Sequence, residues 1–234
     1  MDERLIRKYV RSLISEMGHY APVKAKTAAQ LPHMVKGHES TFEESLSVAV
    51  DACRELGDLP FLYRAHRTKS KSTGIVVVKA EPGGWRRGRM GLTLKLNPAY
   101  NDFMEKLTDS LGFTNIVYTS FGSGRSQFGS PEVFLPLPPY EIAWNPQVRD
   151  VYADFLDATK SGEDPSELIG GYRKGWPTAA TVGTEVLVDV DKYMLLSPSI
   201  MSHTLFYRDK VGASKLARAA TYGELADALS SVTR

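Results

Sequence analysis

Apolar residues recur every three to four positions in five segments of the chain, and this spacing predicts amphipathic helices. Asn97 followed by Pro98 is typical of a helix start, because asparagine caps the first turn and proline is tolerated at its first position. The predicted helices cover residues 3–17, 40–57, 97–112, 146–159 and 221–232.

Short runs rich in valine, isoleucine, phenylalanine and tyrosine predict strands between these helices. The run 132–138 is so rich in proline that we expect it to lie at a sheet edge or to break off before a separate strand at 140–145. Because helices are inserted among the strands without regular alternation, the pattern predicts the α+β class. The predicted strands are 60–68, 74–80, 92–96, 115–121, 132–138, 140–145, 184–197 and 203–209.

The N-terminal segment is predicted to be separate from the rest of the chain. Its helix has one apolar face and a basic back, and residues 18–39 carry two prolines and no periodicity, as in a linker. We therefore expect a docking helix at 1–17, a linker at 18–39 and a main domain at 40–234. The helix would lie in a groove of another protein or of a second copy; the alternative is that it packs on its own domain.

Composition narrows the function classes. The chain has 234 residues, and its net charge of +2 does not by itself indicate a nucleic-acid partner. Cys53 is the single cysteine, so an internal disulfide is impossible. The sequence has no apolar run of the length that spans a bilayer, and we expect no membrane association.

Familiar catalytic motifs are absent from the sequence. There is no phosphate-binding P-loop, no strand-linked GxGxxG, no HExxH and no GxSxG. The five histidines are scattered without metal-ligand spacing, so no metal is expected. The basic stretch Trp85–Arg89 allows two interpretations, a contact with RNA or phosphate and a solvated hairpin tip.

Three polar residues lie at or near the ends of predicted strands. Arg64 lies in "FLYRAHR", Ser120 ends "VYTS", and Glu185 opens "EVLVDV" after a long loop. Taken singly, each has an ordinary explanation as a surface arginine, a turn serine or an edge-strand carboxylate.

In their order along the chain, these strands resemble the arginine–serine–glutamate form of the ADP-ribosyltransferase family. "LYRAH" is similar to that family's arginine strand, and "VYTSF" to its serine strand. A closer similarity is to phage-encoded proteins classified with that family, through "FGSPEVFLPLPPYEIAWNPQVRD" and the N-terminal "LIRKYVRSLI". The resemblance implies an ADP-ribosyltransferase-like split β-sheet core with flanking helices, and an N-terminal amphipathic helix on an extended linker.

The resemblance also implies a role for each residue in cleaving NAD, which would be a substrate. Glu185 would stabilise the positive charge that develops on the ribose, and Ser120 would orient Glu185. Arg64 would bind a phosphate through its planar fork. The remaining implied NAD-binding residues are Thr119, Phe128 and Trp176, with Phe128, Trp176 or Tyr118 stacking on the nicotinamide.

Two departures from the family pattern keep a second hypothesis open. Phe121 stands where the family's serine motif has its last serine, and Gly183 stands where arginine-modifying members have a glutamate. The first hypothesis is an NAD-dependent mono-ADP-ribosyltransferase of a phage, in the virion or the host cytoplasm, with an unknown protein acceptor. The alternative is a structural or adaptor protein of the phage particle, in the capsid, neck or tail. An enzyme would require Arg64, Ser120 and Glu185 to converge on one cleft.

Overall fold

The structure is a computed structural model, and it describes residues 42–66, 75–80, 97–122, 130–178, 180, 182–196 and 221–230. The chain divides into two units, Met1–Leu31 and Pro32–Arg234. The predicted docking helix and linker lie outside the described residues, as do the basic loop 85–89 and the predicted strands 92–96 and 203–209.

In the described residues, helices lie close to the positions that the periodicity predicts. Asn97 caps α4, because its Oδ1 accepts a hydrogen bond from the Tyr100 backbone N–H at 3.3 Å. Gly112 ends the same helix in the left-handed conformation, with φ 68°, which glycine adopts readily. The helices are α2 (Phe42–Leu56), α4 (Pro98–Leu111), α5 (Val151–Ser161), α6 (Glu167–Gly170) and α9 (Tyr222–Ser230).

Helix α5 begins five residues later than predicted. Asn145 Oδ1 accepts a hydrogen bond from the Gln147 backbone N–H at 2.9 Å, which holds the chain in a turn before the helix. Asp150 is the N-cap, in extended conformation, and its side chain accepts from the Ala153 N–H. The apolar period of 146–159 concealed this start because Val148 is buried without being helical.

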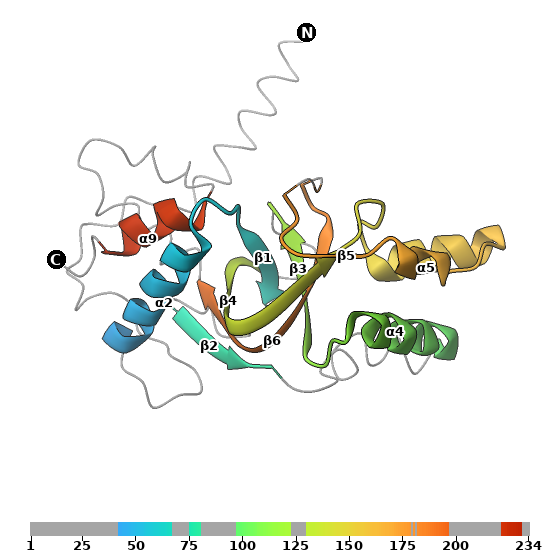
Figure 1. Cartoon of the computed structure of the whole chain (residues 1–234), viewed down its shortest axis with the longest axis horizontal. Coiled ribbons are helices and arrows are strands. Elements are labelled where there is room, and N and C mark those ends of the chain that lie inside the picture. Colours follow the sequence, from blue (N-terminus) through green and yellow to red (C-terminus); the bar gives the residue numbers. More distant parts are fainter. Residues whose placement is uncertain are drawn as a thin grey trace, which may run out of the picture. The chain divides into compact units, whose positions relative to one another are not determined.

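All the described strand pairs are antiparallel, and part of the sheet closes into a small barrel (Figure 1). The sheet order is β2-β6-β3-β1-β4-β5, and an additional pairing of β6 with β4 completes the ring β1-β3-β6-β4. The predicted mixture of helices and strands is therefore confirmed. The strands are β1 (Leu62–His66), β2 (Ile75–Lys79), β3 (Ile116–Phe121), β4 (Ser130–Trp144), β5 (Arg173–Lys174) and β6 (Glu185–Leu196).

The proline-rich segment does not break off as the second alternative of the prediction had it, because β4 is one continuous strand. Between Leu135 and Ile142 it pairs with β6 alone among the described strands, so this stretch lies at an edge, as the first alternative had it. Strand β4 pairs with β6 from Val133 to Trp144 and has β1 and β5 on its other edge. Its register shifts between Leu137 and Tyr140, around the cis bond of Pro138-Pro139. The strand remains continuous because two of its prolines lie at this irregularity. A proline lacks the backbone N–H, and at an irregularity its absence costs the fewest hydrogen bonds between strands.

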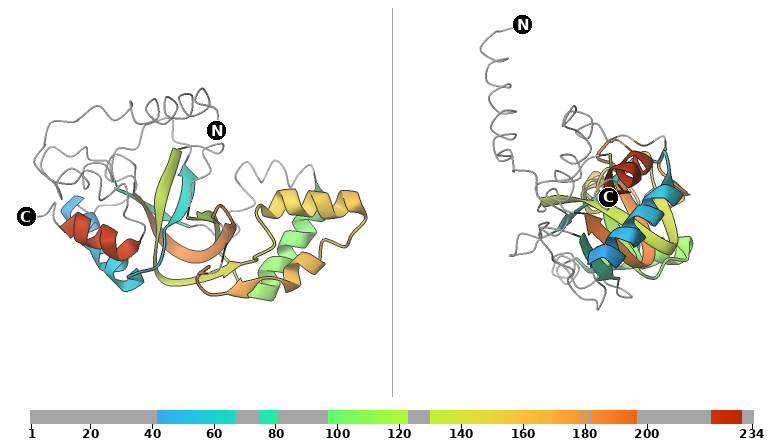
Figure 2. Two further views of the ribbon diagram at one scale, coloured as in Figure 1. Left: turned by 90° about the horizontal axis from the view of Figure 1, so that it is seen from above. Right: turned by 90° about the vertical axis from the view of Figure 1, so that its left-hand side faces the viewer.

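Apolar side chains pack on both sides of the barrel wall. The barrel interior holds Leu62, Val117, Phe121, Phe134, Ile142, Trp144, Val186, Val188, Val190, Tyr193 and Leu195. The outer cluster joins the other face of β3, β4 and β6 to α4 and α5 through Ile116, Ala143, Leu187, Tyr100, Phe103, Leu107, Val151 and Phe155. Figures 1 and 2 show α4 and α5 together at one end of the sheet and the pair α2 and α9 at the other.

Candidate functional site

The three strands that carry the predicted residues are neighbours in the sheet, in the order β1-β3-β6. Tyr63 of β1 lies opposite Ser120 of β3, and Ser120 lies opposite Glu185 of β6. Directly opposed residues of antiparallel strands project to the same face. Ser120 and Glu185 therefore lie side by side on the outer face of the barrel.

Arg64 lies on the other face, so the expected convergence of all three residues is wrong. Alternation along β1 places Arg64 with Leu62, which belongs to the barrel interior, and opposite to Tyr63. Its Nη1 donates a hydrogen bond to the Tyr118 carbonyl at 3.2 Å, and its guanidinium lies 5.5 Å from the centre of the Tyr193 ring. The sequence motifs locate the strands correctly, but they do not fix which face each residue occupies.

The other implied NAD-binding residues are dispersed. Thr119 is buried on the interior side, where its hydroxyl donates to the Val186 carbonyl at 3.0 Å. Trp176 packs edge-on against Tyr222 of α9, with ring centres 5.7 Å apart. Its Nε1 is buried and, in the part of the chain that the structure describes, has no hydrogen-bond acceptor. Phe128 lies outside the described residues.

Glu185 is attached to the start of α5 at two points. The Val151 backbone N–H donates to Glu185 Oε2 at 2.8 Å, and the Glu185 N–H donates to the Arg149 carbonyl at 3.1 Å. An acidic side chain at a helix N-terminus is stabilised by the unpaired N–H groups and the helix dipole. The half-buried carboxylate is therefore held in a defined position between β6 and α5.

Three tyrosines lie near enough to this carboxylate to feel its charge, one each from α4, β3 and the segment after α6. Burial raises the pKa of the Tyr100, Tyr118 and Tyr172 hydroxyls above the ordinary tyrosine value, and the negative charge of Glu185 raises it further. All three tyrosines therefore remain neutral far above pH 7 and add no second charge near Glu185; the Tyr118 hydroxyl itself donates to the Met104 sulfur at 3.8 Å. Sequence reasoning missed Tyr100 and Tyr172, because nothing in their spacing connects them to Glu185.

Sequence reasoning also missed a carboxylate on the side of Arg64. Glu132 of β4 lies directly opposite Arg64 in the β1–β4 ladder, and its side chain is buried. Burial raises the pKa of the Tyr193 hydroxyl nearby, which the charge of Arg64 lowers and that of Glu132 raises. The sequence does contain a signal for this buried glutamate. Glu132 and the apolar Phe134 are two residues apart in one strand, so their side chains project to the same face.

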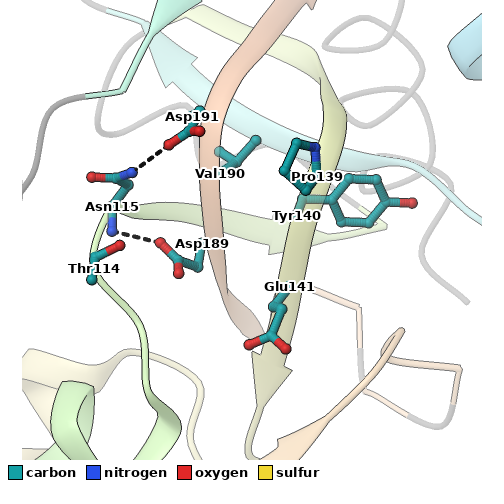
Figure 3. Close-up of a pocket in the computed structure, with 8 residues that line it drawn as sticks. All are labelled: Thr114, Asn115, Pro139, Tyr140, Glu141, Asp189, Val190 and Asp191. Carbon is teal, nitrogen blue, oxygen red and sulfur yellow. Dashed lines mark hydrogen bonds between the residues drawn. The ribbon is translucent and has the colours of Figure 1, made fainter.

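A shallow pocket of about 170 Å³ lies further along β6 and does not include Arg64, Ser120 or Glu185 (Figure 3). Asn115 donates to Asp189 through its backbone N–H and to Asp191 through its side-chain amide. Glu141 accepts a hydrogen bond from Lys174 Nζ at 2.9 Å. These contacts explain how the acidic side chains are held there and do not indicate a ligand. The pocket is lined by Thr114, Asn115, Pro139, Tyr140, Glu141, Asp189, Val190 and Asp191.

No group of three or more histidine, cysteine, aspartate or glutamate side chains in the described ranges has a metal-binding arrangement. None of the helices described has the length and apolar character of a membrane span. Comparisons of the chain with protein-family models, curated proteins and solved structures found no match.

Proposed function

We propose that the protein is an ADP-ribosyltransferase-like protein of a phage that acts on NAD at the outer face of the barrel. The observation that supports this most is the direct pairing of Ser120 with Glu185 across neighbouring strands. The order of the strands that carry the arginine, serine and glutamate motifs adds support, because these strands are adjacent in the sheet. The proposal leaves Arg64 out of phosphate binding, since its side chain belongs to the opposite face.

The chemistry of this reaction depends on the placement of negative charge. When the bond between nicotinamide and ribose of NAD breaks, the electron pair leaves with nicotinamide and positive charge develops on the ribose. A carboxylate fixed beside the ribose stabilises that charge without having to reorganise. Glu185 has such a fixed position, and the neutral tyrosines add no cation that would oppose the developing charge. A protein nucleophile or water would then attack the ribose.

A second candidate function is supported by a specific observation. Arg64 and Glu185 both make contacts within the fold, the first with the Tyr118 carbonyl and the second with the first turn of α5. A structural or adaptor protein of the phage particle would use both residues only in this way. The predicted docking helix at 1–17, with virion proteins or other copies of the chain as partners, serves either candidate.

Release of nicotinamide from labelled NAD separates the two candidates. We expect the wild-type chain to release nicotinamide, and Glu185→Gln to reduce the rate by about 100- to 1,000-fold, because one preorganised electrostatic group is lost. The amide oxygen of glutamine can still accept from the Val151 N–H, so the fold should survive. Asp189→Asn is the matched control, a neutralised carboxylate on the same face of β6 that should leave the rate unchanged. Absence of release from the wild type with every acceptor tested would favour the adaptor protein.

A further inference from the structure

The start of α5 contacts Glu185 through two hydrogen bonds. Arg149 and Val151, two residues apart, contact the backbone N–H and the carboxylate of Glu185 respectively. We propose that Val151 is a positioning residue of the candidate site, because its backbone N–H fixes the Glu185 carboxylate at the place where the ribose charge would develop. This inference rests on the proposed function for its catalytic meaning, whereas the contact itself can be tested separately.

Hydrogen bonds within the turn leave the Val151 N–H directed at Glu185. Asp150 caps the Ala153 N–H at 3.1 Å, while Asp154 Oδ2 accepts from the N–H groups of Arg149 and Asp150 at 2.9 and 3.1 Å. The side chains of the N-cap Asp150 and of Asp154 are thus engaged within the first turn. The backbone N–H of Val151, the first residue of α5, donates to Glu185 of β6. Glu185 therefore caps α5 although it belongs to a strand.

The side chain of Val151 holds this donor in place. It is 2% exposed and belongs to the outer cluster, which also contains Leu187 of β6 and Phe155 of α5. Movement of the α5 start away from β6 would therefore expose apolar surface as well as break the hydrogen bond. The position of the carboxylate is determined by packing on one side and by the ladder with Ser120 on the other.

Proline at position 151 removes this N–H selectively. Proline is favoured at the first position of a helix, where its fixed φ is already suitable. Asp150 has φ −146° and ψ 111°, a conformation that a residue before proline adopts readily. Val151→Ala is the matched control, because like Val151→Pro it loses the two methyl groups of valine but it retains the N–H.

Two measurements on the full chain compare these variants. In steady-state nicotinamide release we expect kcat of Val151→Pro to fall by about 10-fold or more below that of Val151→Ala, as expected for losing a hydrogen bond to a charged group, with KM for NAD unchanged. In a carbon-13 NMR titration, the Glu185 carboxyl should protonate at higher pH in Val151→Pro than in Val151→Ala, since the charged form loses a donor. The charged and titratable groups around this carboxyl are Arg149 and Asp150 just before α5, Asp154 of α5, Tyr100 of α4, Tyr118 of β3, and Tyr172.

The titration keeps this inference separate from the proposed function. If the wild type releases no nicotinamide while the titration midpoint still rises in Val151→Pro, the proposed function fails and the positioning of Glu185 stands. Equal midpoints in Val151→Pro and Val151→Ala would overturn the inference, whatever the activity. If Val151→Pro does not fold, Glu185→Asp provides the test, because its shorter side chain keeps the charge but cannot reach the Val151 N–H. Wild-type kcat and an unchanged carboxyl environment in Glu185→Asp would overturn the inference as well.

Discussion

The two faces of the barrel wall each combine charge with tyrosine, yet they differ in what surrounds the charge. On the interior side, Arg64 lies over the Tyr193 ring and opposite the buried Glu132. On the outer side, Glu185 is half-buried, accepts a hydrogen bond from the first residue of α5 and lies near neutral tyrosines. An arginine between an aromatic ring and a buried carboxylate stabilises a fold. A carboxylate held in place by a backbone N–H is suited to stabilising positive charge in a ligand.

This difference shows that strand parity, which motif order does not reveal, decides which face of the sheet a motif residue occupies. Arg64 and Tyr63 are adjacent in sequence, and one of them faces the interior while the other faces Ser120. A shift of one residue in β1 would exchange them. The comparison therefore predicts that interior substitutions change mainly stability, and that outer substitutions near Glu185 change mainly chemistry.

The largest effect on stability is expected from Phe134→Ala, which tests the interior side. Phe134 is fully buried, with its ring 4.8 Å from that of Tyr193. Removing a buried phenylalanine side chain typically lowers the free energy of unfolding by about 3–5 kcal/mol, through lost transfer energy and the cavity left behind. Denaturant unfolding measures this change. A loss below 1 kcal/mol would mean that the barrel interior is not a packed core.

A second effect is expected in alkaline solution, where the neutral tyrosines of the outer side become charged. The pKa of Tyr118 is raised in the folded protein, so folding favours the neutral form. Its contribution to stability is complete below the unfolded pKa of about 10 and is lost as pH rises from there towards the folded value. Tyr118→Phe should reduce the loss of stability by up to about 1.4 kcal/mol per pH unit in that range. Denaturant unfolding at pH 9 and pH 11 measures this, and identical slopes for wild type and variant would contradict the buried position of the hydroxyl.

A smaller effect should sharpen the description of the outer side. Asp150→Ala removes the side-chain cap of α5 and should lower the free energy of unfolding by roughly 1 kcal/mol. Thr221→Ala removes the hydroxyl that accepts from the Glu224 N–H at the start of α9, at the other end of the sheet from α5 (Figures 1 and 2), and should have a similar effect on stability. Only Asp150→Ala should also reduce nicotinamide release, because it loosens the turn that holds Glu185. Equal release by the two variants would mean that α5 does not position the carboxylate.

The sequence was sufficient to predict most helices, because their apolar periods and caps are local features. Asn97, Pro98 and Gly112 bound α4 as their chemistry requires. The start of α5 was not predictable in the same way, since it depends on a turn held by Asn145 and on a contact with Glu185.

The pairing of Ser120 with Glu185 followed from the resemblance, whereas the position of Arg64 did not. The register between β1 and β3 determines the face of Arg64, and register depends on contacts distant in sequence. The continuity of β4 through its prolines was hidden for the same reason, because its partners on both edges lie far along the chain.

The most direct test of the account compares nicotinamide release from NAD by Glu185→Gln and Arg64→Met, each corrected for the fraction of folded protein. The account predicts that Glu185→Gln loses about 100- to 1,000-fold in rate with little loss of stability. It predicts that Arg64→Met is less stable, because it loses its hydrogen bond and ring contact, but releases nicotinamide at close to the wild-type rate per folded molecule. Equal losses of rate in the two variants would place Arg64 and Glu185 on one ligand and contradict the division of the two faces.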